Sequence, residues 1–264
     1  MAYTRRLSSE RAYLPYNKKL IMRTFVIWLR SLLFLIVFCI AVFGFSALCL
    51  LVFPFLSLRK RFRFGICINH FVTWWFGFCC GVRYQIEGKE NLPKDGNGVL
   101  ISNHQSEWET FYLQVVVFPL CTVLKKELLR IPLFGWALAM VKPIAIDRNK
   151  KANALKQVAE QGVAKLKQGF WVLIFPEGTR MEAGQLGKYS KTGALLAAKA
   201  GKPLVPLLHN GGEHWPKNGF MKKPGVLKVV IGPAIDPEGK SAAEMHEASI
   251  QWIEANRGRV FDRS

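Results

Sequence analysis

Acidic residues are scarce in this sequence. The chain of 264 residues has 37 Lys and Arg against 18 Asp and Glu, which gives a formal net charge of +19. This imbalance indicates an anionic partner, either nucleic acid or an anionic membrane surface. The hydrophobic content of 50% favours the membrane, and the chain carries no nucleic-acid-binding motif that we recognise. We therefore expect membrane lipid as a partner and no nucleic acid.

Ordered cysteine spacing is also missing. Five of the six cysteines are scattered through the apolar N-terminal third, and Cys121 lies in a later apolar run. This spacing argues against a disulfide framework and against a zinc site, and it fits a reducing compartment. His209, His214 and His246 have no mutual metal-ligand spacing, so we expect loop or surface histidines and no bound metal.

Charged side chains are absent from most of the N-terminal third. Ser31–Leu58 contains none, and a second uncharged stretch, Phe64–Val82, is rich in aromatic residues. The first stretch exceeds the roughly 20 residues that a helix needs to cross a bilayer. It is too long for the apolar core of a signal peptide, and no small-residue cleavage pattern follows it. We predict that residues 1–82 form retained, membrane-anchoring helices.

Basic clusters on both sides of Ser31–Leu58 limit how this stretch meets the membrane. One cluster lies between Arg5 and Arg30, and the other is Arg59–Arg63. The positive-inside tendency places both on the cytoplasmic side, which a single crossing does not allow. A re-entrant hairpin bent near Gly44–Ser46, or two interfacial helices in one leaflet, satisfies the tendency. The alternative is an ordinary spanning helix with one cluster left outside.

From residue 83 onward, short apolar runs alternate with helical patterns. This alternation predicts an α/β domain over residues 83–264, with a mixed sheet flanked by helices. The expected strands are Arg83–Glu87, Val99–Asn103, Cys121–Leu124, Pro143–Ile146, Trp171–Phe175, Pro203–Leu208 and Val226–Ile231. The expected helices are Trp108–Val117, Leu128–Val141, Ala152–Lys167, Thr192–Ala200 and Ala242–Ala255. Ligands bind beyond strand ends in such sheets, and His104, Arg148 and Glu177 all follow predicted strands.

The segment Asn103–Glu109 contains a candidate general base. His104 follows a predicted strand, and the carboxylate of Glu109 comes shortly after it. An imidazole accepts a proton near neutral pH, and a carboxylate can hold its other ring nitrogen. The alternative is structural, because Ser106-x-x-Glu109 before an apolar helix fits a capping box. Taken alone, the segment favours the capping interpretation.

Basic residues follow two other predicted strands. Arg148 lies in a turn where Asn149 is a candidate helix cap, and its guanidinium can instead bind two phosphate oxygens. Lys125 and Lys126 either add positive charge to the same pocket, or face solvent or the membrane.

The segment Phe175–Arg180 also allows two interpretations. Its Pro-x-Gly pattern is ordinary turn chemistry. In the functional interpretation, Gly178 admits a ligand close to the backbone, Glu177 orients polar groups of a substrate and Arg180 binds an anion.

Together these blocks resemble the glycerolipid acyltransferase family, and within it the bacterial 1-acyl-sn-glycerol-3-phosphate acyltransferases. The resemblance covers about residues 83–233, and four blocks occur in the family's order. They are Asn103–His104 of the Asn-His-x4-Asp block, Lys125–Gly135 leading to Ile146–Arg148, Phe175–Arg180, and Val205–Pro206. Four blocks in order behind an apolar N-terminus are highly specific. Glu109 departs from the pattern, since Asp is usual there, but either carboxylate can accept an imidazole N–H.

The resemblance implies transfer of an acyl group from a thioester to the sn-2 hydroxyl of 1-acyl-sn-glycerol-3-phosphate, which gives phosphatidic acid. His104 would remove the hydroxyl proton, Glu109 would hold its tautomer, and no acyl-enzyme would form. A phosphate would be bound by Arg148, Arg180 and one of the two lysines. The implied substrate-binding residues are Lys125, Lys126, Arg148, Glu177, Gly178, Thr179 and Arg180. No cofactor is implied, and the donor would be acyl-CoA or acyl carrier protein.

The resemblance also implies a location at the bacterial inner membrane, with the catalytic domain facing the cytoplasm. The basic surface suits anionic lipid and an acidic acyl carrier protein. Two alternatives stay open. A related enzyme would use glycerol-3-phosphate or an ornithine lipid as acceptor, and a non-catalytic membrane-binding protein would use the charge as an anchor. The polar blocks argue against the second alternative, because a membrane anchor needs charge but neither His104 nor Glu177.

Overall fold

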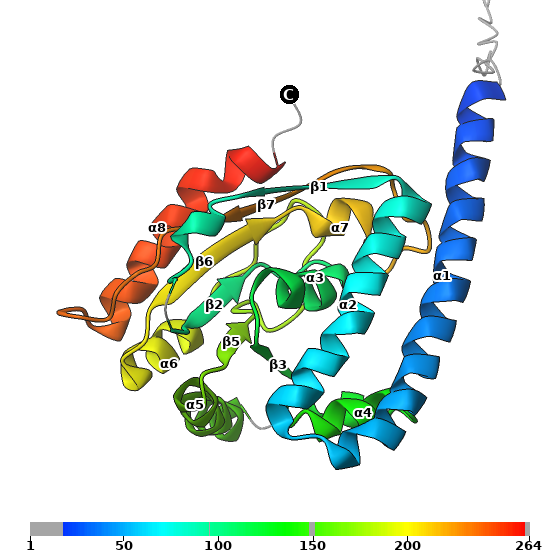
Figure 1. Cartoon of the computed structure of the whole chain (residues 1–264). Helices are drawn as coiled ribbons and strands as arrows, with labels where there is room; N and C mark the ends of the chain where they lie inside the picture. Colours follow the sequence, from blue (N-terminus) through cyan, green and yellow to red (C-terminus); the bar gives the residue numbers. More distant parts are fainter. Residues whose placement is uncertain (1–17, 95, 148–150, 262–264) are drawn as a thin grey trace, which may run out of the picture.

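A seven-stranded sheet forms the centre of the molecule (Figure 1). The computed structural model describes residues 18–94, 96–147 and 151–261. The strand order is β1-β7-β6-β2-β5-β3-β4, and every neighbouring pair is parallel except β6 with β7. The sheet is therefore mixed, as predicted. Its strands are β1 (Val82–Glu87), β2 (Val99–Ser102), β3 (Leu120–Lys125), β4 (Ile144–Ile146), β5 (Trp171–Ile174), β6 (Leu204–His209) and β7 (Gly225–Ile231).

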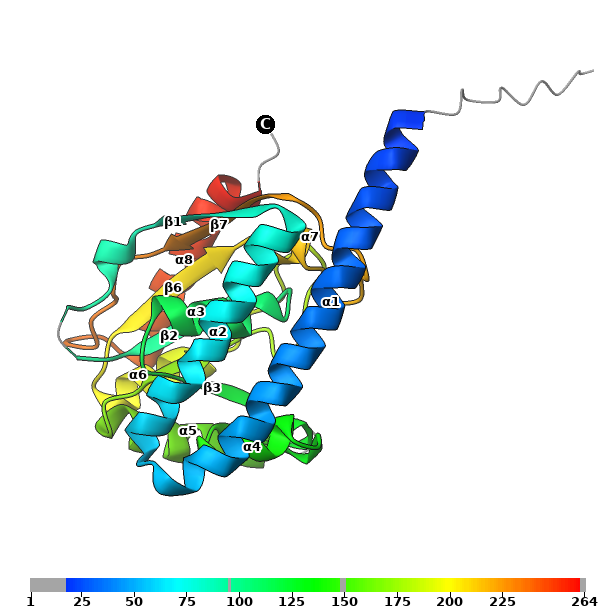
Figure 2. The same cartoon turned by 45° about the vertical axis from the view of Figure 1, so that its right-hand side comes forward.

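Helices cover both faces of the sheet, which explains why its central strands are apolar throughout. Successive side chains of a strand point to opposite faces. In β2, Leu100 joins a core with side chains of α2 (Leu58–Cys80) and α3 (Trp108–Val116). Its neighbours Val99 and Ile101 join a second core with side chains of α5, α6 and α8, on the other side of the sheet (Figure 2). With both faces covered, every residue of β2 and β5 is buried.

The predicted helices of the α/β domain are present, with one exception in form. They are α3 (Trp108–Val116), α5 (Lys151–Lys167), α6 (Thr192–Ala200) and α8 (Ala242–Phe261). Two further short elements are α7 (Gly211–His214) and the 3-10 turn η2 (Lys89–Asn91). Gly201 ends α6 in the left-handed conformation, as expected of a C-cap glycine. The helix α8 continues past the predicted end at Ala255, where Asn256 and Arg259 bond to each other one turn apart.

The predicted helix Leu128–Val141 is instead two short elements. A 3-10 turn, η3 (Lys126–Arg130), precedes α4 (Phe134–Met140). Pro132 lies between them and cannot donate to a helical ladder, and Leu133 takes a positive φ of 60°. A side chain at Gly135 would come within 2.4 Å of the carbonyl oxygen of Leu128, so glycine permits this tight fold.

The N-terminal region is a helical hairpin, but its bend does not lie at the predicted position. The helix α1 (Lys18–Val52) runs unbroken through Gly44–Ser46, and α2 (Leu58–Cys80) returns beside it. One glycine costs about 1 kcal/mol in a helix, too little to break a long apolar one. The chain turns at η1 (Phe53–Phe55), where Pro54 lacks the N–H that a continuing helix needs.

The helix α1 lies along the α/β domain over most of its length (Figures 1 and 2). Phe34 packs edge-on against Trp215 with ring centroids 4.9 Å apart. The Ser31 hydroxyl accepts the backbone N–H of Lys222 at 2.7 Å. Near the hairpin turn, Phe45 stacks on Phe64 of α2. Within the described chain, α1 is the one helix long and apolar enough to cross a membrane by length and composition.

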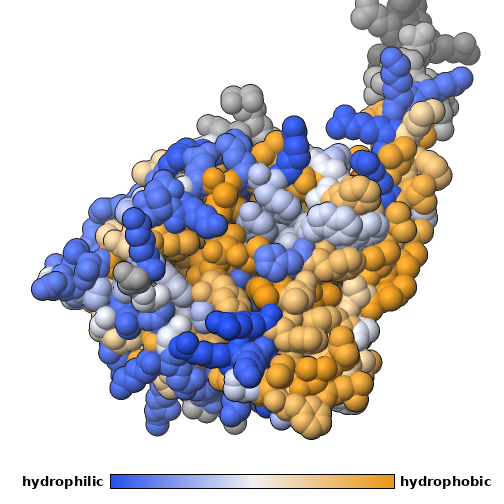
Figure 3. Space-filling view, viewed as in Figure 1, coloured by the Kyte–Doolittle hydropathy of each residue, from blue (hydrophilic) through white to orange (hydrophobic). Residues whose placement is uncertain are grey.

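The outer surface of this hairpin is apolar. Figure 3 shows hydrophobic side chains gathered over α1 and the lower ends of α2 and α4. Phe55 at the turn is 87% exposed, and Trp74 and Phe78 form an exposed stacked pair on α2. We refer to the exposed apolar residues of α1, η1, α2 and α4 as the apolar face.

The basic cluster Arg59–Arg63 partly serves to close the hairpin. Arg61 donates to the carbonyl oxygens of Phe53, Leu56 and Met140, which ties the turn to α4. Arg59 donates to the carbonyl oxygen of Gln168. Of the cluster between Arg5 and Arg30, Arg5, Arg6 and Arg11 lie outside the described residues, while Lys18, Lys19, Arg23 and Arg30 belong to α1. The division of the chain at residue 82 stays a prediction.

Candidate functional site

Three loops meet at one edge of the sheet, where the neighbouring parallel strands β5, β2 and β6 end. Asn103, after β2, exchanges two hydrogen bonds of 2.9 and 3.0 Å with the backbone of His209 at the end of β6. His104 donates its backbone N–H to Glu177 after β5 at 2.7 Å, and its carbonyl accepts the N–H of Met181 at 2.7 Å. These bonds fix the loops relative to one another.

His104 and Glu109 form a buried dyad. The Nδ1 atom of His104 lies 2.5 Å from Oε1 of Glu109, whose side chain is fully buried. The imidazole stacks on Phe175 with ring centroids 4.1 Å apart. A neutral imidazole that donates from Nδ1 to a carboxylate keeps its lone pair on Nε2, so Nε2 is the proton-accepting atom.

Glu109 also caps the helix that it belongs to. Its Oε1 accepts the backbone N–H groups of Gln105 at 3.0 Å and Ser106 at 3.1 Å, while the Ser106 hydroxyl accepts the N–H of Trp108. One side chain therefore makes both the contact with His104 and the contacts of a helix cap. Capping the start of α3 fixes the direction from which Glu109 holds the imidazole.

Burial shifts the ionisation of both carboxyl groups at this edge. It raises the pKa of Glu109 to about 7, although the charge of His209 and the N–H groups of Ser106 and Gln105 favour the charged form. It likewise raises the pKa of Glu177 to about 7, against the N–H groups of Gly187 and His104. Burial therefore disfavours the charged form of both carboxyl groups.

A cavity of about 450 Å³ opens beside His104. Its wall combines basic and polar groups with an apolar side, a combination that suits a lipid with an anionic head. The lining residues are His104, Thr110, Thr122, Val123, Leu124, Lys125, Leu128, Phe175, Thr179, Arg180, Lys217 and Asn218.

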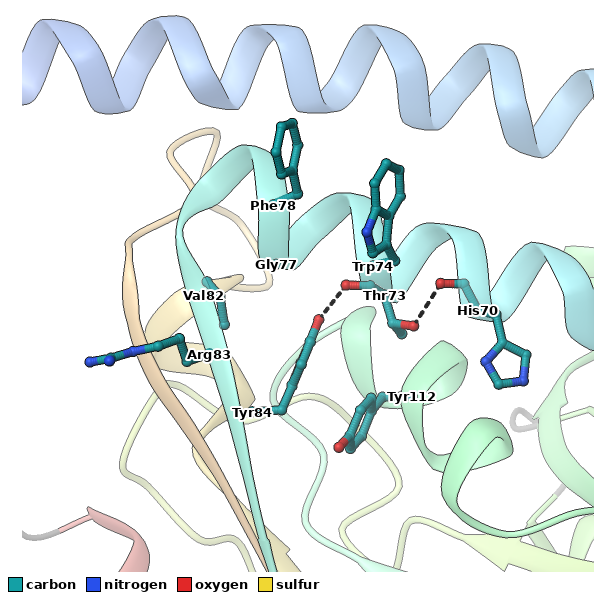
Figure 4. Close-up of a pocket in the computed structure, with 9 residues that line it drawn as sticks. All are labelled: His70, Thr73, Trp74, Gly77, Phe78, Val82, Arg83, Tyr84 and Tyr112. Atoms are coloured by element: carbon teal, nitrogen blue, oxygen red, sulfur yellow. Dashed lines mark hydrogen bonds between the residues drawn. The ribbon is translucent and has the colours of Figure 1, made fainter.

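A second, larger cavity of about 590 Å³ lies between α2, β1 and α3 (Figure 4). There the Tyr84 hydroxyl donates to the carbonyl oxygen of Thr73 at 2.7 Å, while Trp74 and Phe78 point toward α1. Neither His104 nor Glu109 lines this cavity, so we do not assign acid–base chemistry to it although it is larger.

The structure separates the predicted basic residues. Lys125 and Arg180 line the cavity beside His104. Lys126 points elsewhere and pairs with Asp147 at 2.5 Å. Arg180 is held at 2.5 Å by Glu107, which precedes α3. Arg148 lies outside the described residues.

The remaining predicted residues of Phe175–Arg180 have distinct surroundings. Thr179 lines the cavity. Glu177 accepts backbone N–H groups of His104 at 2.7 Å and Gly187 at 2.9 Å, so it braces the loop that carries the dyad. Gly178 has a positive φ of 70°, and a Cβ added there would meet nothing within 4 Å, so backbone conformation is the structural reason for glycine.

Three residues of the site were missed from the sequence. Glu107 holds Arg180, and Lys217 reaches the carbonyl oxygen of Arg180 at 3.0 Å and Glu182 at 2.9 Å. His209 was expected in a loop or on the surface, but it ends β6 and is fully buried; His214 is also buried. The signal for His209 was its position after an apolar run, the same signal that identified His104. Lys217 lies within the turn from Pro216 to Gly219, and no sequence pattern identifies it as a site residue.

No group of three or more His, Cys, Asp or Glu side chains among residues 18–94, 96–147 and 151–261 could hold a metal ion. The arrangement offers acid–base chemistry at His104 and anion binding at Lys125, Arg180 and Lys217.

Comparisons with known proteins agree with this geometry. An acyltransferase family model matches residues 83–210, which include the dyad and the loop after β5. A 1-acyl-sn-glycerol-3-phosphate acyltransferase of Pseudomonas aeruginosa is 44% identical over 88% of this chain and 91% of its own length. One of Limnanthes alba is 30% identical over 74% of this chain and 68% of its own.

A solved structure extends the likeness to the fold. The crystal structure of the 1-acyl-sn-glycerophosphate (LPA) acyltransferase from Thermotoga maritima matches with a TM-score of 0.71 and 25% identity. The match covers 89% of this chain and 98% of that one, so it includes most of the helical hairpin as well as the sheet. With a relative of this identity over nearly its whole length, the chain belongs to the acyltransferase family.

Proposed function

We propose that this chain transfers an acyl group from a thioester to the sn-2 hydroxyl of 1-acyl-sn-glycerol-3-phosphate and so forms phosphatidic acid. The observation that carries the proposal is the buried His104–Glu109 dyad beside a cavity with basic residues on one side and apolar residues on the other. The names of the bacterial and plant relatives point to the same acceptor.

The chemistry needs one base and no enzyme nucleophile. Nε2 of His104 takes the hydroxyl proton while the hydroxyl oxygen attacks the thioester carbonyl. The tetrahedral intermediate collapses, the carbon–sulfur bond breaks, and the thiolate leaves with the proton from the imidazolium. In its charged form, Glu109 stabilises the imidazolium between these steps.

The phosphate of the acceptor would be bound by Arg180, Lys125 and Lys217. Glu107 occupies the Arg180 guanidinium at 2.5 Å, so phosphate binding would exchange one anionic partner for another or share the guanidinium fork. Arg148 joins this set on the strength of the family resemblance. The apolar wall formed by Val123, Leu124 and Leu128 suits the acyl chains.

The apolar face would hold the enzyme on the membrane that contains its substrate. Because α1 packs on the α/β domain from Trp28 to Phe38, an insertion of this face into one leaflet keeps those contacts. A full crossing of α1 would have to break them. We place the enzyme at the inner membrane with its catalytic edge on the cytoplasmic side, where acyl-CoA or acyl carrier protein supplies the acyl group.

The test is acyl transfer to 1-acyl-sn-glycerol-3-phosphate, with acyl-CoA and with acyl carrier protein, for the wild type and for His104→Ala. We expect phosphatidic acid from the wild type with at least one donor, and a loss of about 10³-fold in kcat for the variant. Glycerol-3-phosphate and ornithine-lipid acceptors serve as the comparison. Preferred use of either would contradict the acceptor, and substantial activity of His104→Ala would contradict the base. Inactivity with every acceptor would favour a membrane-binding protein without catalysis.

A further inference from the structure

His209 is a buried histidine that the mechanism above does not use. It ends β6, its side chain is 0% exposed, and it does not line the catalytic cavity. Its Nδ1 accepts the backbone N–H of Gly211 at 3.0 Å, so the ring hydrogen of the neutral form lies on Nε2. Nε2 lies 3.0 Å from the carbonyl oxygen of Asn103 and 3.5 Å from Oε2 of Glu109.

The close approach of Gly211 makes this tautomer possible. A Cβ at Gly211 would lie 2.8 Å from the Trp108 ring and 3.0 Å from Nδ1 of His209. Only glycine lets the backbone N–H reach the imidazole at that point. The Trp108 ring meets His209 edge-on at 5.4 Å, which holds the imidazole plane.

The two oxygens of Glu109 have unequal surroundings. Oε1 is shared by three donors, from His104, Gln105 and Ser106. Oε2 is buried and makes no hydrogen bond within the described part of the chain. A buried carboxylate oxygen needs a donor. The single Nε2–H of His209 has two acceptors within reach, the carbonyl oxygen of Asn103 at 3.0 Å and Oε2 at 3.5 Å, so Oε2 is the longer branch of a shared hydrogen bond.

We propose that His209 is a positioning residue for the reaction, which donates from Nε2 to Glu109 Oε2 and thereby keeps Oε1 on His104. The carboxylate then bridges two imidazoles, with the catalytic one on the cavity side and the positioning one in the core. The inference rests on the proposed function, because it assigns His209 through the general base of that reaction.

The length of Glu109 fits this arrangement. Its two oxygens lie 2.5 Å from one imidazole and 3.5 Å from the other. A carboxylate one methylene shorter would reach one imidazole at the expense of the other. The distance between the two loops, which the Asn103–His209 hydrogen bonds fix, thus matches a glutamate.

Charge supports the same assignment. The titratable groups around this pair are Arg180 and Glu177, which interact with Glu109, and His104, which interacts with His209. Burial lowers the pKa of His209, and the Glu109 carboxylate opposes that shift. Removing the Nε2–H donor therefore disfavours the charged form of Glu109, so its pKa rises further.

The experiment compares His209→Gln with His209→Asn in the full-length enzyme. A glutamine amide can reach the position of Nε2 and donate to Oε2, whereas an asparagine amide reaches only the position of Nδ1. We expect Gln to retain kcat within about threefold of wild type and Asn to lose about tenfold, with unchanged KM values. The acid limb of the kcat–pH profile should shift to higher pH by about one unit in His209→Asn and should not shift in His209→Gln.

His214→Gln is the matched control, because His214 is buried in the next segment and bonds to the carbonyls of Lys223 and Val226 rather than to Glu109. The acid limb of its kcat–pH profile should coincide with that of the wild type, even if the substitution lowers the Tm. Equal kcat and equal acid limbs for the Gln and Asn variants of His209 would overturn the proposal. An NMR titration of Glu109 in the same proteins requires no substrate, so it tests the positioning role even if the acceptor is another lipid.

Discussion

The catalytic edge of the sheet and the apolar face of the hairpin use opposite kinds of contact. At the edge, polar groups are buried and are held by hydrogen bonds to specific partners, such as Glu109 Oε1 with its three donors. On the apolar face, large side chains such as Phe55 and Trp74 are exposed and none depends on a directional bond. The loss of a single hydrogen-bond partner in a buried site has a large effect, because it leaves a buried polar group unsatisfied. The loss of one apolar side chain from an exposed face removes only a small share of the binding free energy, since that energy grows in proportion to the apolar area.

The sharpest test of the edge is the charge of Glu109. Glu109→Gln keeps an oxygen for the N–H groups of Gln105 and Ser106 but removes the charge that stabilises the His104 imidazolium. We expect kcat to fall about 10²-fold, measured as acyl transfer at saturating substrate, while Glu109→Asp keeps more activity. Equal activity of the Gln variant and the wild type would reduce Glu109 to a cap and remove the main contrast between the two regions.

A matched pair of neighbouring lysines tests whether position or bulk charge matters at the edge. Lys125 lines the cavity, while Lys126 pairs with Asp147. Lys125→Ala should raise the KM for the lysolipid about tenfold, the effect of one charge-assisted contact, and leave kcat nearly unchanged. Lys126→Ala removes the same charge and should change the KM by less than about twofold. Equal effects would mean that the basic surface acts as a whole, as the apolar face does.

Glu177 allows a test of stability against pH. Burial raises its pKa to about 7, above the unfolded-state value, so the native state binds the extra proton. The resulting stability is fully present below about pH 4.5 and is lost as pH rises through 7. The Tm of the wild type should therefore fall relative to that of Glu177→Gln between pH 5 and pH 8, by a few degrees in thermal unfolding. A constant difference across this range would show that Glu177 keeps one charge state.

Much of this architecture follows from local pattern. All seven strands lie where apolar runs were found, and the dyad was identified because His104 and Glu109 follow such a run. The bend lies at Phe53–Phe55 and not at the predicted Gly44–Ser46, because Pro54 ends the helix whereas a single glycine does not.

Other features depend on contacts between distant segments and have no local signature. Glu107 meets Arg180, and His209 meets Glu109, only because β2 lies between β5 and β6. Neither the choice of Lys125 over Lys126 nor the place of Lys217 can be read from spacing, because adjacent basic residues look alike until the fold orients them. The sequence therefore predicts the residues that we propose for the chemistry better than the residues that hold them in place.

The apolar face should respond least to single substitutions. Trp74 is 58% exposed on α2, so Trp74→Ser removes apolar area from the membrane contact and disturbs no hydrogen bond within the core. We expect binding to phosphatidylglycerol vesicles to weaken about threefold, measured by co-sedimentation. Leu155 is similarly exposed, at 44%, but lies on α5 across the sheet, so Leu155→Ser should leave vesicle binding unchanged. An equal loss in both variants would mean that general hydrophobicity, rather than this face, holds the protein on lipid. A loss as large as that of Glu109→Gln would mean that Trp74 makes a specific contact, and the two regions would no longer differ in kind.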